Sequence, residues 1–174
     1  MGKRSGTVEG ELLSRAALAL FDEAYYGPSD PRGTWFTDNE PKAGLLGVLE
    51  GVSASEASRP LSAADLLTIA SHVGHVRYSL SLINRAAKGE NPYQSADWAG
   101  SWEARTVSEA EWVELLAGLR AEYEAFRAVL SSGRAWKDEE LLTGTFAQIA
   151  HGAWHLGAIR QALGMVSAPR DAGP

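Results

Sequence analysis

The sequence predicts an all-α protein: a four-helix bundle of up-down order, with one extra short helix and long loops. Apolar residues recur at spacings of three and four over four long segments, as on the buried face of a helix. Gly- and Pro-rich stretches separate these segments, and capping signals precede two of them. We expect the 174 residues to form a single domain over 1–174, with a disordered tail from about residue 167.

The first helix is expected over residues 10–26, and the Gly- and Pro-rich stretch that follows ends it. Its apolar residues keep a helical spacing: Leu12, Leu13, Ala16, Leu20 and Ala24. A short apolar helix is expected over 44–51, continuing weakly to Ala57. The loops at 27–41 and 89–107 exceed the usual length of a helix–helix connection, and loops of this kind often cover a functional end of a bundle.

The next long helix is expected over residues 61–88. Ser62 can cap it, Asp65 suits the positive end of its dipole, and Gly89 follows its last turn. Its expected core stripe is Leu66, Ile69, Val73, Val76, Leu80 and Ile83, with a second apolar set of Leu67, Tyr78 and Leu82.

Two further long helices follow in the second half of the chain. Ser108 and Glu111 form a capping box that opens a helix to about Leu130. Its in-phase apolar residues are Trp112, Leu115, Leu119, Tyr123, Phe126 and Leu130. The last helix is expected from 138 or 139 to about 165, with a stripe of Leu142, Phe146, Ile149, Ala153, Leu156 and Leu163.

Charge and composition restrict the function. The net charge of −6 argues against a nucleic-acid surface, which needs clustered Lys and Arg. The chain has no cysteine, so any metal must be held by His, Asp, Glu, Asn or Gln, and any thiol must come from outside. No apolar run reaches the ~18 residues of a membrane span, and the N-terminus lacks the apolar region of a signal peptide. We therefore expect a cytoplasmic protein without a membrane partner.

The histidines carry the main functional signal. All four lie in two short segments at helical spacing, His72 with His75 and His151 with His155. An i,i+3 pair and an i,i+4 pair each project from one side of a helix, so neighbouring helices would bring the four rings together. Neutral imidazole is the commonest metal ligand among side chains, and three such ligands leave a coordination position open.

The phase of each pair places it beside its helix's core stripe rather than in its centre, at about 100–160° around the helix. Side chains beside the core stripe can line a cleft between two helices or under a loop. The alternative is that these are structural or surface histidines, but an unligated i,i+4 pair has no evident structural use.

Two aromatic residues of the 89–107 loop, Trp98 and Trp102, are candidates for a roof over an apolar pocket beside the metal. Ordinary packing is the more frequent role of such residues. The acidic pair Glu139 and Glu140 is better explained as a helix-start preference than as acid–base catalysis.

The two histidine segments resemble the DinB-like superfamily of metal-binding four-helix bundles, which includes the bacillithiol-transferase type. The last-helix segment, His151-Gly-Ala-Trp-His155-Leu-Gly-Ala-Ile, is similar to the family's two histidines followed by x-Gly-x-Ile. The segment Ile69-Ala-Ser-His72-Val-Gly-His75 is similar to the family's earlier-helix histidine. Ala158 stands where the family usually has Gln.

The resemblance implies one divalent ion, nickel, zinc or similar, bound by His151, His155 and a third histidine. The phase favours His72 as the third ligand, whereas the family pattern favours His75; we expect His75, with His72 as the alternative.

The implied activity is a metal-dependent thiol transferase that activates a low-molecular-weight thiol for attack on an electrophile. A metal-dependent hydrolase and a non-catalytic metal-binding stress-response protein are the alternatives. By analogy with the family we also expect a homodimer, with Trp112 and Leu115 as exposed interface positions.

Overall fold

The computed structural model describes residues 9–30, 32–61, 66–136 and 138–167, and within these ranges the chain contains helices and no strand. The expected all-α class is confirmed. The long helices are α1 (Gly10–Tyr25), α4 (Ile69–Ala86), α5 (Glu109–Ser131) and α6 (Glu139–Ser167). The short ones are α2 (Leu45–Val48), α3 (Ala54–Ala57) and the 3-10 turns η1 (Pro92–Ser95), η2 (Gly100–Trp102) and η3 (Arg134–Trp136).

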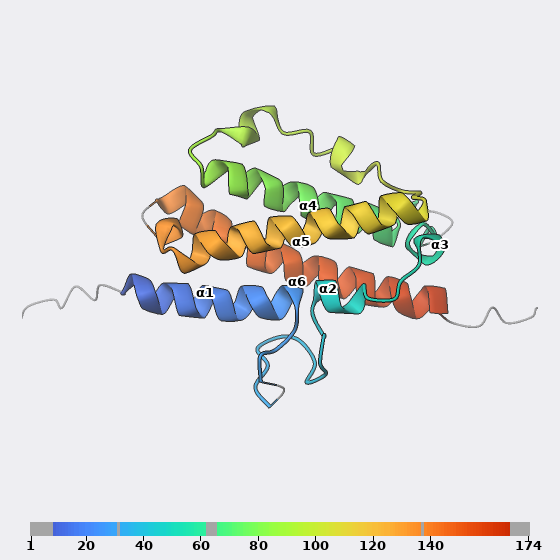
Figure 1. Ribbon diagram of the computed structural model, residues 1–174, viewed down its shortest axis with the longest axis horizontal. Helices are drawn as coiled ribbons and strands as arrows, with labels where there is room; N and C mark the ends of the chain where they lie inside the picture. The colour runs from blue at the N-terminus through green and yellow to red at the C-terminus, as the bar shows by residue number, and fades with distance from the viewer. Residues whose placement is uncertain (1–8, 31, 62–65, 137, 168–174) are drawn as a thin grey trace, which may run out of the picture.

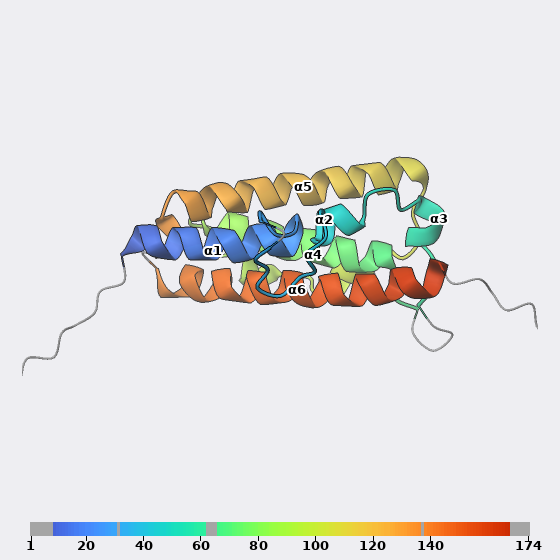
Figure 2. The ribbon, with the colours of Figure 1, turned by 90° about the horizontal axis from the view of Figure 1, so that it is seen from below.

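The four long helices lie side by side, and their directions differ from the expected up-down order (Figures 1 and 2). Helices α4 and α5 run parallel, because Arg77 lies against Gly118 and, further along both helices, Asn84 donates to the carbonyl of Glu122. Helices α4 and α6 run antiparallel, since Gln148 bonds Ser79 and His155 meets His72. The expected alternation is therefore wrong.

The segment between α4 and α5 runs back along the outside of α4, whereas we expected it to cross one end of the bundle (Figure 1). A parallel pair requires such a return, over the ~27 Å of an 18-residue helix. The return segment is fastened where it meets the start of α4, because Thr68 donates to the carbonyl of Arg105. This path lays η1 and η2 against α4, with η2 beside the histidines and η1 near the end of the helix.

The start of α4 differs from the expected one. Thr68 caps the helix in a box with Ser71, so regular helix begins at Ile69. The expected cap Ser62 and its partner Asp65 lie outside the described residues. Leu66 precedes the helix and is exposed, so it does not belong to the core stripe. The remaining members of that stripe are buried as expected: Ile69, Val73, Val76, Leu80 and Ile83.

Helix α5 follows the prediction closely, whereas α1 does not. The box of Ser108 and Glu111 caps α5, and all six expected apolar positions are buried. This corrects the expected interface positions, since Trp112 and Leu115 belong to the core and cannot form an exposed interface. In α1, Leu12 is exposed, and the buried side is formed by Ser14, Ala17, Phe21, Glu23, Ala24 and Tyr25. Aromatic contacts fix this side: Phe21 stacks on Tyr123 and meets Phe126 edge-on, and Tyr25 packs against Tyr123 at a tilt.

The expected helix at 44–57 is split into α2 and α3, with Gly51 between them at a φ of 82°. A left-handed residue of this kind ends a helix, and glycine adopts it without strain.

The buried side of α6 is rotated from the expected stripe. Phe146 was expected in the core but is 52% exposed. The buried positions are Thr145, Gln148, Ile149, Gly152, His155, Leu156, Ile159 and Ala162. His155 therefore lies in the middle of the packed face, where we expected it beside the core stripe. Along the described part of the chain, every helix is too short or too polar to cross a membrane.

Candidate metal centre

The four histidines meet where the first turns of α4 pack against the middle of α6. His155 packs against His72, with ring centroids 5.0 Å apart, and His75 lies 5.0 Å from His151 and 5.2 Å from His155. Gly152 allows α6 to sit this close to α1, because a Cβ there would come within 2.9 Å of the Tyr25 ring. The expected convergence of the two pairs is confirmed.

Three of these rings form a set that could hold a metal ion. One ring nitrogen from each of His75, His151 and His155 lies within 4.8 Å of the others. The Nε2 atoms of His151 and His155 are 3.0 Å apart. Two nitrogens that share a zinc-like ion at about 2.0–2.1 Å are separated by roughly 3.3 Å in tetrahedral geometry, so this pair already has nearly the required spacing.

Burial keeps the rings in the neutral form that binds metals. His155 is fully buried, His75 is nearly so, and His151 is half-buried. Burial, reinforced by the neighbouring imidazoles, lowers the pKa of His75 to about 4 and that of His155 to about 2. Burial also lowers the pKa of His151. Near neutral pH the three rings therefore present unprotonated nitrogens.

A hydrogen bond from the return segment fixes which nitrogen of His75 is available. Ser101 Oγ lies 2.6 Å from the carbonyl of Trp98, which can only accept, so the hydroxyl proton is used there. The same Oγ lies 2.7 Å from Nδ1 of His75 and must accept its proton. Nε2 of His75 is thereby left with its lone pair.

His72 contacts the triad from outside. Its Nδ1 lies 2.9 Å from Nδ1 of His155, the nitrogen that faces away from His151. A metal-bound histidine usually has its second nitrogen held in this way, which orients the ring. Of the two α4 histidines, His75 thus belongs to the three-nitrogen set, whereas His72 contacts the opposite nitrogen of His155.

Tryptophans surround the cluster. Trp102 stacks on His75, with centroids 4.0 Å apart and planes 17° apart, and Trp98 lies 5.9 Å from the same ring. The structure therefore places both sequence-predicted tryptophans beside the histidines. Trp154 packs edge-on to His155 at 4.6 Å, yet it is 61% exposed.

Sequence reasoning missed Trp154 and Ser101 as neighbours of the site. The sequence offered one indication for each: Trp154 directly precedes His155, and Ser101 directly precedes Trp102. Neither residue type has a spacing rule that predicts such contacts, because both depend on how the return segment and α6 pack.

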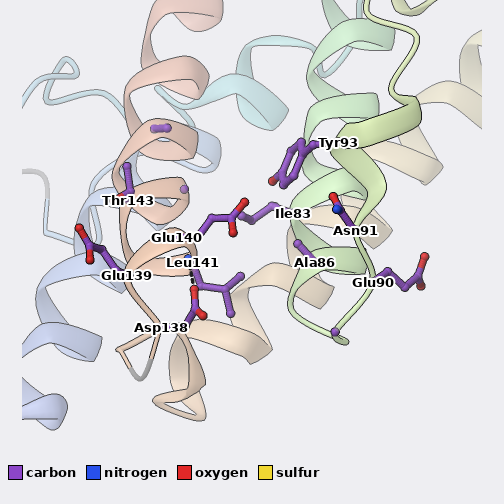
Figure 3. Close-up of a pocket in the computed structure, with 13 residues that line it drawn as sticks. Ile83, Ala86, Glu90, Asn91, Tyr93, Asp138, Glu139, Glu140, Leu141 and Thr143 are labelled. Carbon is purple, nitrogen blue, oxygen red and sulfur yellow. Dashed lines mark hydrogen bonds between the residues drawn. The ribbon is translucent and has the colours of Figure 1, made fainter.

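A cavity of about 980 Å³ lies further along α4 and α6, on the far side of the Gln148–Ser79 contact from the histidines. Figure 3 shows Glu140 of α6 and Tyr93 of η1 pointing toward one another across it. Burial and the charge of Glu140 raise the pKa of Tyr93. The histidine cluster does not line this cavity, so the candidate metal ligands and the cavity are separate features.

Comparison of the chain with protein-family models, with curated proteins and with solved structures found no match.

Proposed function

We propose that this protein is a DinB-like four-helix bundle that binds one divalent metal ion through His75, His151 and His155, and uses it to activate a low-molecular-weight thiol. The single observation that carries the proposal is the set of three ring nitrogens within 4.8 Å of one another. Its support from the sequence is the resemblance of the two histidine segments to that superfamily.

The chemistry of the donor set fits a metal that acts on an external ligand. The set contains three imidazoles and no carboxylate, so it would leave the charge of a divalent ion uncompensated. A bound divalent ion of this kind lowers the pKa of a thiol or water ligand and favours its anionic form. Three protein ligands also leave at least one coordination position for that ligand.

The chain's own residues would hold and orient this arrangement. Ser101 keeps the proton of His75 on Nδ1, and His72 holds the ring of His155 in place. Trp98 and Trp102, from the return segment, cover one side of the histidines and limit the access of water. The thiolate would then form a bond from its sulfur to the electrophilic atom of the second substrate, whose leaving group departs with the electron pair.

The test joins elemental analysis with a thiol assay. The purified protein is stripped with a chelator, reloaded with nickel, zinc or manganese, and incubated with a panel of low-molecular-weight thiols and an alkylating electrophile. We expect about one metal per chain and a metal-dependent loss of free thiol above the uncatalysed rate. His151→Ala should abolish both, whereas Ala125→Glu, on the exposed side of α5, should preserve both.

Stoichiometric metal with no thiol reaction, but with ester or amide hydrolysis, would instead assign the activity to a bound water. Stoichiometric metal with neither reaction would assign a binding role. Failure to retain any metal would overturn the proposal itself.

A further inference from the structure

The Nδ1 atoms of the three candidate ligands have different surroundings. In His75, Nδ1 donates to Ser101, and in His155 it lies 2.9 Å from Nδ1 of His72. In His151, Nε2 meets Nε2 of His155 at 3.0 Å, so Nδ1 is the nitrogen on the other side of the ring. This Nδ1 is buried and has no hydrogen-bond partner among the described residues. The support of the His151 ring is therefore incomplete, whereas the other two rings are each held through Nδ1.

Metal binding would make Nδ1 of His151 a hydrogen-bond donor. A neutral imidazole carries one proton, so a ring that binds an ion through Nε2 must carry its proton on Nδ1. A buried N–H group without an acceptor disfavours the state that requires it, because the group has lost its hydrogen bonds to water and gained none. The affinity of this site for a metal therefore depends on an acceptor within reach of His151 Nδ1.

Gln148 offers such an acceptor one turn earlier on α6. Its Oε1 is buried and, like Nδ1 of His151, has no partner among the described residues. Residues three apart on a helix are neighbours. Both side chains also extend toward α4, because Gln148 bonds Ser79 and the ring of His151 lies 5.0 Å from that of His75. Since Ser79 follows His75 by four positions on α4, the amide and the imidazole lie one turn apart at the same interface.

The contact with α4 also decides which end of the Gln148 amide is the oxygen. Nε2 of Gln148 lies 2.8 Å from Oγ of Ser79 and 3.4 Å from the carbonyl oxygen of Ser79. A carbonyl oxygen can only accept, so the N–H₂ group of the amide belongs at this end. The remaining atom, Oε1, is an acceptor, which complements the donor that His151 becomes when it binds a metal.

We propose that Gln148 is a positioning residue of the metal centre, whose Oε1 accepts the Nδ1–H of His151 when Nε2 of that ring binds the ion. The inference rests on the metal binding proposed above. The two atoms are not bonded to one another in this structure, so one of the two side chains rotates when the ion binds. Each of the three ligands then has its Nδ1 paired, which orients all three rings toward the ion.

A second buried group near His151 provides a comparison. The hydroxyl of Tyr25 is buried and also has no partner among the described residues. It meets α6 from the side of α1, at Gly152, where a Cβ would come within 3.2 Å of the hydroxyl oxygen. The ring of His151 extends instead toward α4, where it meets His75. This geometry favours Gln148 over Tyr25 as the acceptor, and substitutions can separate the two.

The first test is zinc titration of the full chain. Gln148→Met keeps the length of the side chain without its amide oxygen, and it should bind one zinc ion with about 10–100-fold lower affinity than the wild type. Gln148→Glu keeps an acceptor oxygen and should bind zinc at least as tightly as the wild type. Two controls should bind like the wild type: Tyr25→Phe removes the buried hydroxyl on α1, and Thr145→Val removes one on α6 that is bonded to the carbonyl of Leu141.

The second test observes the hydrogen bond directly. In the zinc-loaded wild type, proton–nitrogen correlation spectra of the histidine rings should show the Nδ1 proton of His151, protected from exchange with water. His151→Ala identifies this signal by its loss. In Gln148→Met the proton should exchange with water much faster, whereas in Thr145→Val it should stay protected. A structural role for Gln148 alone would not change the exchange of this one proton.

The outcomes separate this inference from the proposed function. A wild type that binds no zinc would overturn the metal centre itself. A wild type that binds zinc, together with unchanged affinity in Gln148→Met or a loss of affinity in Tyr25→Phe alone, would overturn the role of Gln148 and leave the metal centre intact. So would a loss in Gln148→Met that a folded Gln148→Glu does not restore. If Gln148→Glu does not fold, the exchange of the His151 proton in Gln148→Met decides.

Discussion

The two sides of this molecule differ in how their polar side chains are hydrogen-bonded. Between α1 and α5, acidic groups are matched by donors: Asp22 accepts from the Tyr123 hydroxyl and from Nε of Arg127. Between α4 and α6, four histidines face mainly one another, and Nδ1 of His151 is buried without a hydrogen-bond partner among the described residues. On the first side the acidic group is paired with donors, whereas on the second a buried ring nitrogen lacks a partner among the described residues.

Glu23 of α1, which faces the 35–37 segment, is a second acidic group with matched donors. Its carboxylate is almost fully buried and accepts hydrogen bonds from the backbone N–H groups of Trp35, Phe36 and Thr37, all at 2.9 Å. Burial alone would raise the pKa of this carboxyl group, but the three backbone donors, with the Thr37 hydroxyl, lower it. Glu23 therefore holds the 35–37 backbone in place, and both of its carboxylate oxygens accept hydrogen bonds.

The difference indicates which cluster is built for an added ligand. A buried group whose hydrogen bonds are complete gains nothing from a metal. A group of neutral imidazoles with converging lone pairs gains a strong partner. Substitutions at the histidines should therefore change metal affinity, whereas substitutions of the hydrogen-bonded acidic groups should change the free energy of unfolding.

The largest effect is expected for His155→Ala. His155 is the most deeply buried of the histidines and joins His72 to His151. Its loss should lower metal affinity at least 100-fold, equal to about 2.7 kcal/mol. The measurement is metal titration followed by calorimetry, with retained folding checked by circular dichroism. Unchanged metal affinity would remove the cluster from consideration as a metal site.

A smaller effect is expected for His72→Ala. If His72 orients His155 and does not itself bind the ion, metal affinity should fall by about 10–100-fold while the stoichiometry stays at one. The matched comparison is His75→Ala, which should lose as much affinity as His155→Ala. An equal and complete loss in both α4 variants would mean that all four histidines are ligands, leaving less room for an external thiol.

The smallest effect on metal affinity is expected for Glu23→Gln, which should instead lower the stability of the fold. The amide can accept at one atom only and adds an N–H₂ group beside backbone donors, so the free energy of unfolding should fall by about 1–3 kcal/mol. Metal affinity should stay within about two-fold of the wild type. Urea unfolding and metal titration on the same sample provide both values. A loss of metal affinity here would contradict the separation of the two sides.

The sequence alone determined the helical class, the α5 cap at Ser108, the α5 core stripe and the pairing of the histidines. These are local properties: capping boxes and three- and four-residue spacings act within one or two turns of a helix, so neighbouring residues suffice to specify them. The convergence of His72, His75, His151 and His155 was also predictable, since it needs only that two helices be neighbours.

Tertiary packing decided the rest. The order of helix directions depends on where the 87–108 segment runs, which the spacing of apolar residues does not encode. The buried side of α6 was misassigned because that helix has few charged residues beyond its first turn, so its composition could not distinguish the face against Tyr25 and Ile83 from its exposed face. The different surroundings of His72 and His75 depend in part on Ser101, which reaches Nδ1 of His75 only because the return segment lies along α4. Contacts between residues far apart in sequence carry this information, and no single segment contains it.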